Sequence, residues 1–591
     1  MFDVLARFGD VIIERSEFPA ADASLGGQLG WCVVQLSKLV MLQQHFGWRD
    51  REAVRRATKD MEVKACLGLG IEQIGPSQAT LCRHRQRMQE LDLVERCQER
   101  LFALLHAAEL LDKNEPVLID SVPIHGAGQI LDSYNLLAGS VRHGLQALAK
   151  AQKRPFAEVA AELDLSMYLP RSVKGHFSVD WSDAEARRGV LAQLVADALR
   201  VRALLLELEE AAVDEVCTEG LTAASETIEQ LIEQDVEFDD QGAVSGIRQK
   251  AGDDRRISLT DADMRHGRKS ASVLIAGYKA QIVATVLYGF ILLTRVIKAN
   301  QHDGQDLPEL VNELATREFT PEWWGGDHAY GTIANHRFFD EDERGELVAR
   351  MARPTNGGRF TKDEFDYDFE RNTLTCPAGL TVLQSRWATC HGRKGRRFQF
   401  PADRCGGCKE RERCISPTAD AARGRSVFIV DDEERLIRAH LKRRNDADFR
   451  EKLQQRPHVE RAIAGFAQCG GKRARRFGQA DIAFDASLSA LTYNLRRLGS
   501  LMRDVPELQA RVEEAAHRLF LCLLQLWFST SIRPSPSVWR DAVILLASAP
   551  FCSPDGRREM EMIHRPTSKR PPLTKVVVNH ASRRRRRACA R

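Results

Sequence analysis

Residues 115–121 read Glu-Pro-Val-Leu-Ile-Asp-Ser, and the rest of the chain is organised around this stretch. The apolar run Val117–Ile119 predicts a buried β-strand, and the strand ends on the carboxylate of Asp120. Burying a carboxylate is costly unless a cation or hydrogen-bond donors compensate it. Taken alone, Asp120 is best explained as a turn residue at the end of a strand.

Two later carboxylates stand in contexts that can bring them to Asp120. Asp327 follows the tryptophan pair at 323–324, and Glu460 lies in a helical stretch just past Pro457. Two strand-end aspartates and a helix-borne glutamate form the kind of ligand set that holds divalent metal ions for phosphoryl transfer. We therefore predict a metal site made by Asp120, Asp327 and Glu460.

The composition is that of an ordinary globular chain with room for several domains. The chain has 591 residues, of which 43% are hydrophobic and 28% charged. A net charge of +4 is too small to indicate nucleic-acid binding by itself, but Arg and Lys cluster locally and can form basic patches.

Nothing in the sequence indicates secretion or a membrane. The start, Met1-Phe2-Asp3, lacks a basic segment followed by an apolar one, and the apolar run 519–528 is far shorter than the roughly 20 residues that span a bilayer. The 14 cysteines are spread thinly, unlike those of a disulfide-stapled domain. We expect a cytoplasmic protein with no membrane partner.

The first third of the chain opens with a helical region. Residues 31–110 show helical periodicity, with a turn at Gly68 and Gly70 before a helix that carries Arg83 and Arg87. A helix, a glycine-containing turn and an arginine-rich helix are typical of a helix-turn-helix-like DNA-binding unit. The alternative is an amphipathic helix whose arginines are merely solvated.

The middle of the chain predicts an α/β fold. A mostly helical block covers about 130–235, and two antiparallel strands, 280–288 and 290–299, meet at Gly289. A helix at 306–314, a strand at 323–327, a helix at 332–343 and a strand at 346–349 follow. This alternation predicts a sheet with an antiparallel start and helices packed on it.

Cysteines gather in the region from about 353 to 430. Cys405 and Cys408 lie on a Cys-Gly-Gly-Cys turn, and Cys376 and Cys414 flank it. Four thiolates with a two-residue spacing in one pair can close a tetrahedral structural zinc site. The alternatives are four unrelated reduced cysteines, or a site that uses the rival ligands Cys390-His391.

Basic residues follow the helical stretch of Glu460. Arg456 and Glu460 are four residues apart and share a helix face. The run Gly471–Arg476 is a basic loop suited to phosphate contact, with candidate contacts at Lys472, Arg473, Arg475 and Arg476. Beyond about 530 the chain is rich in Pro and Ser and ends in an arginine run, which predicts a poorly ordered tail.

These motifs resemble the DDE-type transposases of bacterial insertion sequences, over roughly residues 30 to 500. Leu-Ile-Asp-Ser at 118–121 resembles the first catalytic strand of that family, and Gly-Tyr-Lys at 277–279 with the two strands after it resembles the second and third strands. Asp-His-Ala-Tyr at 327–330 resembles the second catalytic motif, and the stretch 456–461 resembles the third. The N-terminal helical part and the Cys-bearing insertion are also similar to those of relatives.

The third motif departs from a broader signature of the group, Tyr-x2-Arg-x3-Glu-x6-Lys. Arg456 and Glu460 fit it, but Leu453 stands at the Tyr position and Ala467 at the Lys position. Lys472 or Arg473 is a candidate for the missing cation.

The resemblance implies an RNase H-like catalytic domain that cleaves and joins DNA. Asp120, Asp327 and Glu460 would hold two Mg²⁺ ions, with Mn²⁺ able to substitute. Double-stranded DNA is the implied partner, both as the terminal inverted repeats of the element and as target DNA, and a homodimer or larger assembly is expected because two ends must be synapsed. Further candidates for DNA contact are Lys269, Lys279, Tyr330 and Arg456.

The sequence leaves two other functions open. One is a catalytically decayed, transposase-derived DNA-binding protein, and the other is an RNase H-like nuclease that cuts without joining. The expected domains are a helical DNA-binding domain (1–110), the first part of the catalytic domain with a helical insertion at about 130–250 (111–350), a Cys-rich insertion (351–430), the rest of the catalytic domain with Glu460 (431–505), and a C-terminal helix with a basic tail (506–591).

Overall fold

The strand predicted at Val117 lies at the centre of the structure, a computed structural model that describes residues 1–13 and 31–529 apart from short gaps. The gaps are 171, 173, 178, 212–214, 250–251, 253, 269–271, 342–343, 352–355 and 418–422. By its internal contacts the chain divides into two units, Met1–Phe520 and Leu521–Arg591. The predicted basic tail lies outside the described residues.

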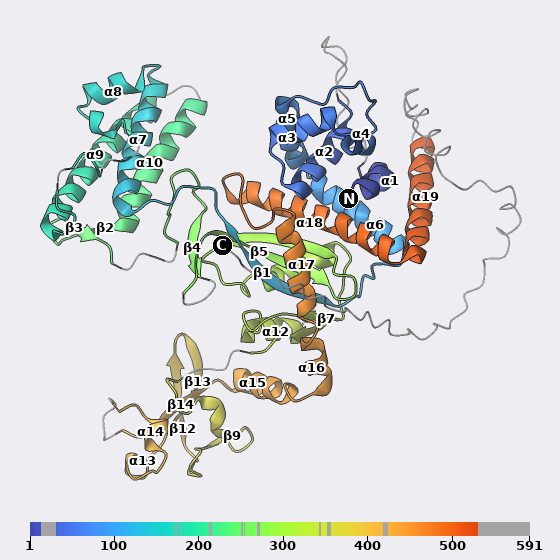
Figure 1. Ribbon diagram of the computed structural model, residues 1–591. Helices are drawn as coiled ribbons and strands as arrows, with labels where there is room; N and C mark the ends of the chain where they lie inside the picture. The colour runs from blue at the N-terminus through green and yellow to red at the C-terminus, as the bar shows by residue number, and fades with distance from the viewer. Residues whose placement is uncertain are drawn as a thin grey trace, which may run out of the picture. The chain divides into compact units, whose positions relative to one another are not determined.

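A six-stranded mixed sheet is built around this strand, β1 (Val117–His125), and the predicted α/β class is confirmed (Figure 1). One edge of β1 pairs antiparallel with β5 (Leu274–Thr285), and the other pairs parallel with β7 (Trp323–Gly325). Outside β7 lies β8 (Glu346–Val348), also parallel. β5 also pairs antiparallel with β4 (Arg265–Arg268) and with β6 (Ile291–Lys298).

Both faces of β1 are buried, which explains its continuous apolar run. Val117 and Ile119 belong to a core shared with the N-terminal helices, whereas Leu118 and Val122 face a second core. This alternation follows from the two-residue period of a strand. Helices α11 (Leu307–Thr316) and α12 (Ile333–Glu341) connect the later strands.

The predicted strands are confirmed, with changed ends. The hairpin turns at Gly289, whose φ of 71° lies in the left-handed region that glycine adopts without strain. β5 begins at Leu274, earlier than predicted, and β4 was missed because Arg265–Arg268 offers no apolar run.

Six helices form the N-terminal region: α1 (Phe2–Ile12), α2 (Val33–Phe46), α3 (Asp50–Lys59), α4 (Met61–Leu67), α5 (Gln78–Glu90) and α6 (Leu93–Ala107). The turn between α4 and α5 is held by Lys64, whose Nζ donates to the carbonyls of Gly70, Ile71 and Gln73. This buried ammonium fixes the connection that precedes the arginine-bearing helix.

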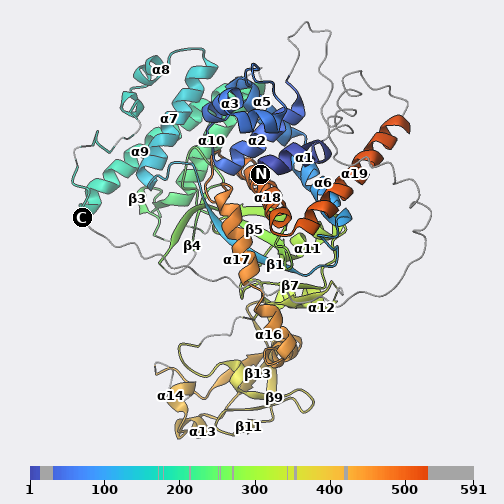
Figure 2. The same cartoon turned by 45° about the vertical axis from the view of Figure 1, so that its right-hand side comes forward.

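The region after β1 is a helical insertion, and Figure 2 shows its long helices α7, α9 and α10 side by side. It consists of α7 (Ser133–Ala151), α8 (Phe156–Glu162), η3 (Ser166–Tyr168), α9 (Ala184–Ala211), α10 (Glu215–Asp235), β2 (Val236–Phe238) and β3 (Val244–Ile247). These elements bury a core of their own around Leu145, Leu194 and Leu231. The prediction of a helical block at about 130–235 is confirmed.

The Cys-rich region contains short strands and turns. Its elements are η4 (Lys362–Glu364), β9 (Asp366–Asp368), β10 (Thr373–Thr375), β11 (Thr381–Val382), β12 (Ser385–Cys390), β13 (Arg393–Gln399), α13 (Ala402–Gly406), α14 (Arg411–Cys414) and β14 (Ser426–Ile429). Two three-stranded sheets, β11–β10–β9 and β12–β13–β14, enclose buried Phe365, Phe398 and Phe400.

Helices complete the described chain: α15 (Asp431–Arg443), α16 (Ala447–Leu453), α17 (Pro457–Gln468), α18 (Gln479–Asp504) and α19 (Pro506–Ser529). Leu488, Leu491, Leu495 and Leu498 of α18 share one core with the N-terminal helices and the sheet. Of the helices that the structure describes, none has the length and apolar character needed to cross a membrane.

Candidate active site

Asp120 lies within β1, which continues to His125, so the prediction that the strand ends on this carboxylate is wrong, whereas Asp327 follows the end of the parallel strand β7. In the register of β1 with β7, Val117 is opposite Trp324 and Leu118 is opposite Gly325. Continuing that register sets Asp120 level with Asp327 and on the same face of the sheet. Accordingly, the negative charge of Asp327 contributes to a raised pKa of Asp120. The two carboxylates are therefore near enough to interact electrostatically, and their use as a joint metal site stays a prediction.

The Asp120 carboxylate is held from two sides. Its Oδ1 accepts a hydrogen bond from the Ser121 N–H at 2.8 Å, and its Oδ2 lies 3.4 Å from Nη2 of Arg456. Burial raises the pKa of Asp120, whereas the Ser121 hydrogen bond and the Arg456 charge oppose that rise. Arg456, a predicted DNA contact, therefore touches the first carboxylate directly.

Asp327 begins a tight turn after β7. Its Oδ1 accepts from the Ala329 N–H at 2.8 Å, and its carbonyl accepts from the Tyr330 N–H at 3.2 Å. A Cβ at Gly326 would lie 3.0 Å from Cβ of Tyr330. The turn therefore requires a small residue before Asp327, and it keeps that side chain at the strand end.

Glu460 stands on α17, one helical turn after Arg456. Its side chain is exposed, whereas the preceding Val459 is buried in the core that contains β1 and β5 residues. Among the residues that the structure describes, no three or more His, Cys, Asp or Glu side chains are grouped closely enough to hold a metal ion. The structure thus sets Asp120 level with Asp327, and it carries Glu460 on α17, which packs against β1 and β5.

A further carboxylate, Asp303, was missed by the sequence analysis. It follows β6, and its Oδ2 accepts from Ser121 Oγ at 2.5 Å while its Oδ1 accepts from Lys279 Nζ at 2.5 Å. Since Ser121 neighbours Asp120, Asp303 is linked to the residue beside the first predicted carboxylate. In the sequence, Asp303 is marked only by its place within the polar turn at 300–304.

Two predicted DNA contacts, Lys279 and Tyr330, are engaged or hidden in this structure. The Lys279 side chain is 11% exposed and is paired with Asp303, so it is not a free phosphate contact. The Tyr330 ring is fully buried, and its hydroxyl interacts with the Gln281 side chain. Its contact with DNA stays a prediction, and it requires the ring to become exposed. Burial, followed by the charges of Asp303, Asp120 and Asp327, raises the pKa of Tyr330 well above its usual value.

The predicted basic loop lies beside the end of β1. The Lys472 carbonyl accepts from the His125 N–H at 3.0 Å, and the Ala474 N–H donates to the His125 carbonyl at 2.9 Å. Lys472, Arg473 and Arg475 are exposed. These three side chains are accessible to phosphates near the catalytic strand.

Arg476 differs from the rest of the basic loop. It contacts the Asp485 carboxylate at 2.9 Å and lies over the Phe484 ring at 4.9 Å. Its predicted DNA contact is replaced here by an intramolecular one. Lys269, another predicted contact, lies outside the described residues.

The arginine-bearing helix α5 has an exposed and a buried side. Arg83 is exposed and Arg87 is half-buried, whereas His84 packs inward with its ring nitrogen 2.9 Å from Ser37 Oγ. Arg85 is paired with Asp50 at 2.5 Å. Of the two predicted contacts, Arg83 is the more accessible to DNA.

The four predicted zinc ligands line one small pocket. Cys376, Cys405, Cys408 and Cys414 all border it, together with Phe360 and Phe400. Burial raises the pKa of the Cys414 thiol, and the charges of the other three thiolates would raise it further. The four thiols thus border one pocket, but in this structure no three of them are grouped closely enough to hold a metal ion. Cys390 does not border the pocket.

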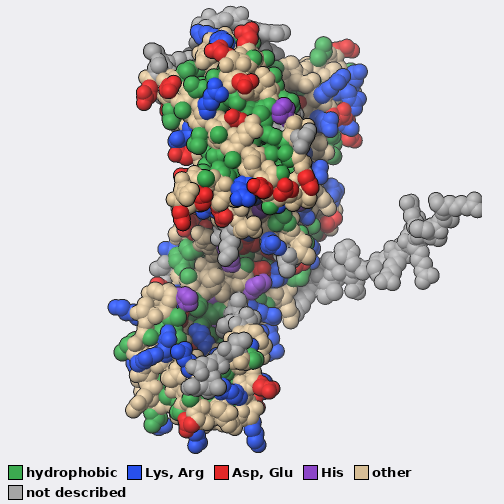
Figure 3. Space-filling view, turned by 90° about the vertical axis from the view of Figure 1, so that its left-hand side faces the viewer, with side chains coloured by type: hydrophobic (Ala, Val, Ile, Leu, Met, Phe, Trp, Pro, Cys, Tyr) green, Lys and Arg blue, Asp and Glu red, His purple; other side chains and the backbone are tan. Residues whose placement is uncertain are grey.

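A larger cavity of about 690 Å³ opens beside the Asp327 turn. It is bordered by His302 and His328 on one side and by Lys362 and Arg393 of the Cys-rich region on the other. Figure 3 shows Lys and Arg side chains gathered over the Cys-rich region with few Asp and Glu among them. Asp363 and Glu433 also border the cavity, and Glu433 is paired with Arg393, so its acidic and basic side chains balance.

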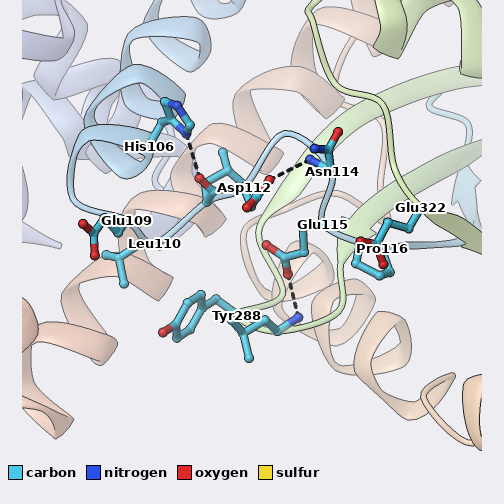
Figure 4. A pocket seen from close by; sticks show the side chains of 11 residues that line it. His106, Glu109, Leu110, Asp112, Asn114, Glu115, Pro116, Tyr288 and Glu322 are labelled. Atoms are coloured by element: carbon cyan, nitrogen blue, oxygen red, sulfur yellow. Dashed lines mark hydrogen bonds between the residues drawn. The ribbon is translucent and has the colours of Figure 1, made fainter. Parts of the chain in front are cut away.

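Another cavity, of about 420 Å³, lies before β1 and has the opposite character (Figure 4). Four carboxylates border it, those of Glu109, Asp112, Glu115 and Glu322, and no Lys or Arg does. Burial raises the pKa of Glu115, whose Oε1 accepts from the Leu287 N–H at 2.7 Å. Its acidic lining is unsuited to phosphate.

Two family models match this chain. One, described as a transposase DDE domain, matches residues 375–499, which include Glu460 and the four zinc-candidate cysteines. The other, described as a transposase domain (DUF772), matches residues 3–87, which include α5 up to Arg87. No curated protein and no solved structure matches the chain.

The matches and the geometry agree on the same class of protein. The DDE model covers the segment that returns from the Cys-rich region to α17, and α17 packs on the strand of Asp120. The N-terminal model covers helices that share a core with α18. The two matches, over residues 3–87 and 375–499, support a DDE transposase of an insertion sequence.

Proposed function

We propose that this transposase cleaves DNA at the ends of its insertion sequence and joins those ends to target DNA. The observation that carries the proposal is the register of β1 with the parallel β7, which sets Asp120 level with Asp327 just past the end of β7. The sheet supports it as well, because the order β6–β5–β1–β7–β8, antiparallel then parallel, is that of an RNase H-like domain.

Asp120, Asp327 and Glu460 are the residues that would hold two Mg²⁺ ions, with Mn²⁺ able to substitute. Their hard oxygen ligands suit these ions better than softer metals. When bound, the ions would activate a water or a DNA 3′-hydroxyl and stabilise the leaving oxygen. Glu460 must approach the other two carboxylates for this, and its exposed side chain on α17 leaves it free to reorient.

Other residues of the chain bind and orient DNA in this proposal. Arg456 holds the Asp120 carboxylate, and Lys472, Arg473 and Arg475 contact phosphates beside β1. Arg83 and Arg87 on α5 read or grip the element end. Because two ends must meet, the working form is a homodimer or larger, acting on chromosomal DNA in the cytoplasm.

In this proposal Cys376, Cys405, Cys408 and Cys414 would hold one structural Zn²⁺, and they would have to draw closer together than they lie in this structure. The fit rests on the four thiols bordering one pocket and on the turn after Cys376, whose Sγ accepts from the Leu380 N–H at 3.3 Å. Backbone donors of this kind stabilise a thiolate. The ion would lock a region whose own apolar core is small.

A second candidate function is DNA binding without catalysis. Its support is that Glu460 is exposed and that Leu453 and Ala467 depart from the wider signature of the group. A nuclease that cuts without joining has no such observation in its favour.

The test is end cleavage and strand transfer with Mg²⁺, comparing wild type with the isosteric variants Asp120→Asn, Asp327→Asn and Glu460→Gln. We expect each variant to lose activity while retaining affinity for the element end. Wild-type binding without cleavage, in Mn²⁺ as well, would support the non-catalytic function. Cleavage without joining would support the nuclease, and full activity of Glu460→Gln would mean that another residue is the third ligand.

A further inference from the structure

The Asp303–Lys279 ion pair lies directly behind the carboxylate strand. Neighbouring residues of a strand point to opposite faces, so Ser121 and Asp120 lie on opposite sides of β1. Ser121 Oγ donates to Asp303 Oδ2 at 2.5 Å, which sets Asp303 on the face away from Arg456. The pair is 21% exposed at Asp303 and 11% at Lys279, so water screens it poorly.

The same aspartate ties together the pieces that carry the catalytic carboxylates. It binds β1 through Ser121 and β5 through Lys279, whose Nζ also donates to the Gln301 carbonyl at 2.5 Å. The adjoining Gly304 carbonyl accepts from Asn335 Nδ2 at 2.8 Å, and the same amide donates to the Tyr330 carbonyl at 2.9 Å. The loop of Asp303 is thus joined to the turn of Asp327.

The backbones of these two loops lie so close together that a side chain larger than that of glycine does not fit between them at Gly304. A Cβ at Gly304 would lie 2.2 Å from the Ala329 carbonyl oxygen, so only glycine fits there without a backbone shift. The Tyr330 ring is fully buried at this contact, since a Cβ at Gly304 would also lie 3.1 Å from Cα of Tyr330.

We propose that Asp303 is a positioning residue of the active site and that its pairing with Lys279 sets the charge on which divalent-cation binding depends. The region contains three negative side chains, those of Asp120, Asp327 and Asp303. It also contains two positive ones, those of Arg456 and Lys279. Neutralising Asp303 leaves the Lys279 charge uncompensated behind the metal ligands. Removing Lys279 instead leaves an extra negative charge. The two changes therefore have opposite effects on cation affinity.

This inference rests on the proposed use of Asp120 and Asp327 as metal ligands. The experiment measures Mn²⁺ affinity by calorimetry and by the paramagnetic resonance of bound Mn²⁺, on zinc-supplemented full-length protein without DNA. Asp120→Asn identifies the signal that belongs to the active site. We expect Asp303→Asn to weaken Mn²⁺ binding about tenfold, because an uncompensated charge in a poorly screened region acts strongly on a divalent ion.

Three further variants distinguish an effect of net charge on Mn²⁺ affinity from an effect of a disturbed local structure. Lys279→Met is expected to bind Mn²⁺ at least as tightly as wild type, and Asp303→Asn/Lys279→Met to return to within about threefold of it, since the net charge is restored. Ser121→Ala, which removes only a neutral hydrogen bond, is expected to stay within the same range. Circular dichroism and affinity for the element end establish that each variant is folded.

Each outcome decides the proposal. Opposite shifts in the single variants, with recovery in the double variant, support it. The proposal is overturned if Mn²⁺ affinity falls equally in Asp303→Asn and in the double variant, or if it is unchanged in Asp303→Asn. Neither result contradicts the proposed metal site itself. If Asp303→Asn does not fold, a weakened Lys279→Met overturns the proposal by itself. Wild type that binds no Mn²⁺ at the Asp120-dependent site overturns the proposed function as well.

Discussion

Arg456 and Asp120 are in contact although 336 positions separate them in the sequence, with Nη2 of one 3.4 Å from Oδ2 of the other. Arg456 is the residue just before α17, so this contact fixes the start of that helix against β1. Glu460 follows one turn later, about 6 Å further along the helix axis. The approach of the third carboxylate therefore depends on an arginine that also touches the first.

Replacing Arg456 by alanine is expected to lower the rate of end cleavage about 100-fold, because a small displacement of Asp120 and α17 misaligns the reacting groups. Arg461→Ala, which removes an exposed arginine of the same helix, is the matched control and should stay near wild type. Single-turnover cleavage of end DNA measures both. Equal losses in the two variants would mean that general charge on α17, not contact with Asp120, matters.

Cys405→Ser and Cys408→Ser are each expected to abolish binding of one Zn²⁺ per chain and to destabilise the Cys-rich region by about 4 kcal/mol or more, as losses of structural metals do. Cys390→Ser should retain the ion, because Cys390 does not border the four-cysteine pocket. Metal analysis of the purified variants and thermal melts give the result. Retention of zinc by Cys405→Ser, or its loss from Cys390→Ser, would exclude the proposed ligand set.

Within the basic loop, Lys472→Ala and Arg473→Ala are expected to weaken DNA binding and to reduce the slope of log affinity against log salt by about one each, because each loses one phosphate contact. Arg476→Ala should instead lower the thermal stability, since it leaves Asp485 without its partner. Salt titrations of end binding and melts distinguish these effects. An unchanged salt slope in the first two variants would remove the loop from the DNA interface.

Acid is expected to destabilise the chain through His336. Burial, followed by the charge of His440, lowers the pKa of His336 to about 3. The pKa of an imidazole in the unfolded chain is near 6.5, so the unfolded chain binds a proton at a higher pH than the folded chain does. The contribution of neutral His336 to the free energy of unfolding is therefore complete above about pH 6.5 and is lost as the pH falls toward 3. Between pH 6.5 and 5 the free energy of unfolding of wild type should fall about 1.5 kcal/mol more than that of His336→Phe.

Urea unfolding at a series of pH values measures that difference. His517→Gln, at an exposed histidine, is the control and should follow wild type. Parallel pH curves for wild type and His336→Phe would show that His336 does not carry the acid sensitivity.

Sequence patterns predicted the elements that bury apolar runs, and they failed where polar residues decide the structure. The strands around Val117 and the hairpin at Gly289 follow from continuous apolar runs and a turn residue. The polar β4 is a strand because β5 offers it free hydrogen-bonding groups, and such pairing leaves no periodic signal.

The residues of the candidate site could be predicted where the neighbouring sequence carries a recognisable pattern. Asp120 and Asp327 each follow an apolar run, which marked both of them, although β1 continues past Asp120 to His125 through residues that pair with β5. Asp303 has no such mark, because its partner Ser121 lies 182 positions away and only the folded sheet brings them together. The motif around Tyr330 does not reveal that its ring is buried, with the close backbones of Gly326 and Gly304 beside it.

The core shared by the N-terminal helices and α18 affects how the protein is made. Gln44 on α2 donates to Ser489 Oγ on α18 at 2.8 Å, across 445 positions of sequence. The apolar face of the first helices therefore stays uncovered on the ribosome until α18 has been synthesised, and contacts so distant in sequence form slowly. The chain thus acquires its N-terminal helices and its central sheet together, once α18 has been synthesised, and a chain that stops before α18 is left with exposed apolar surface for proteases to recognise.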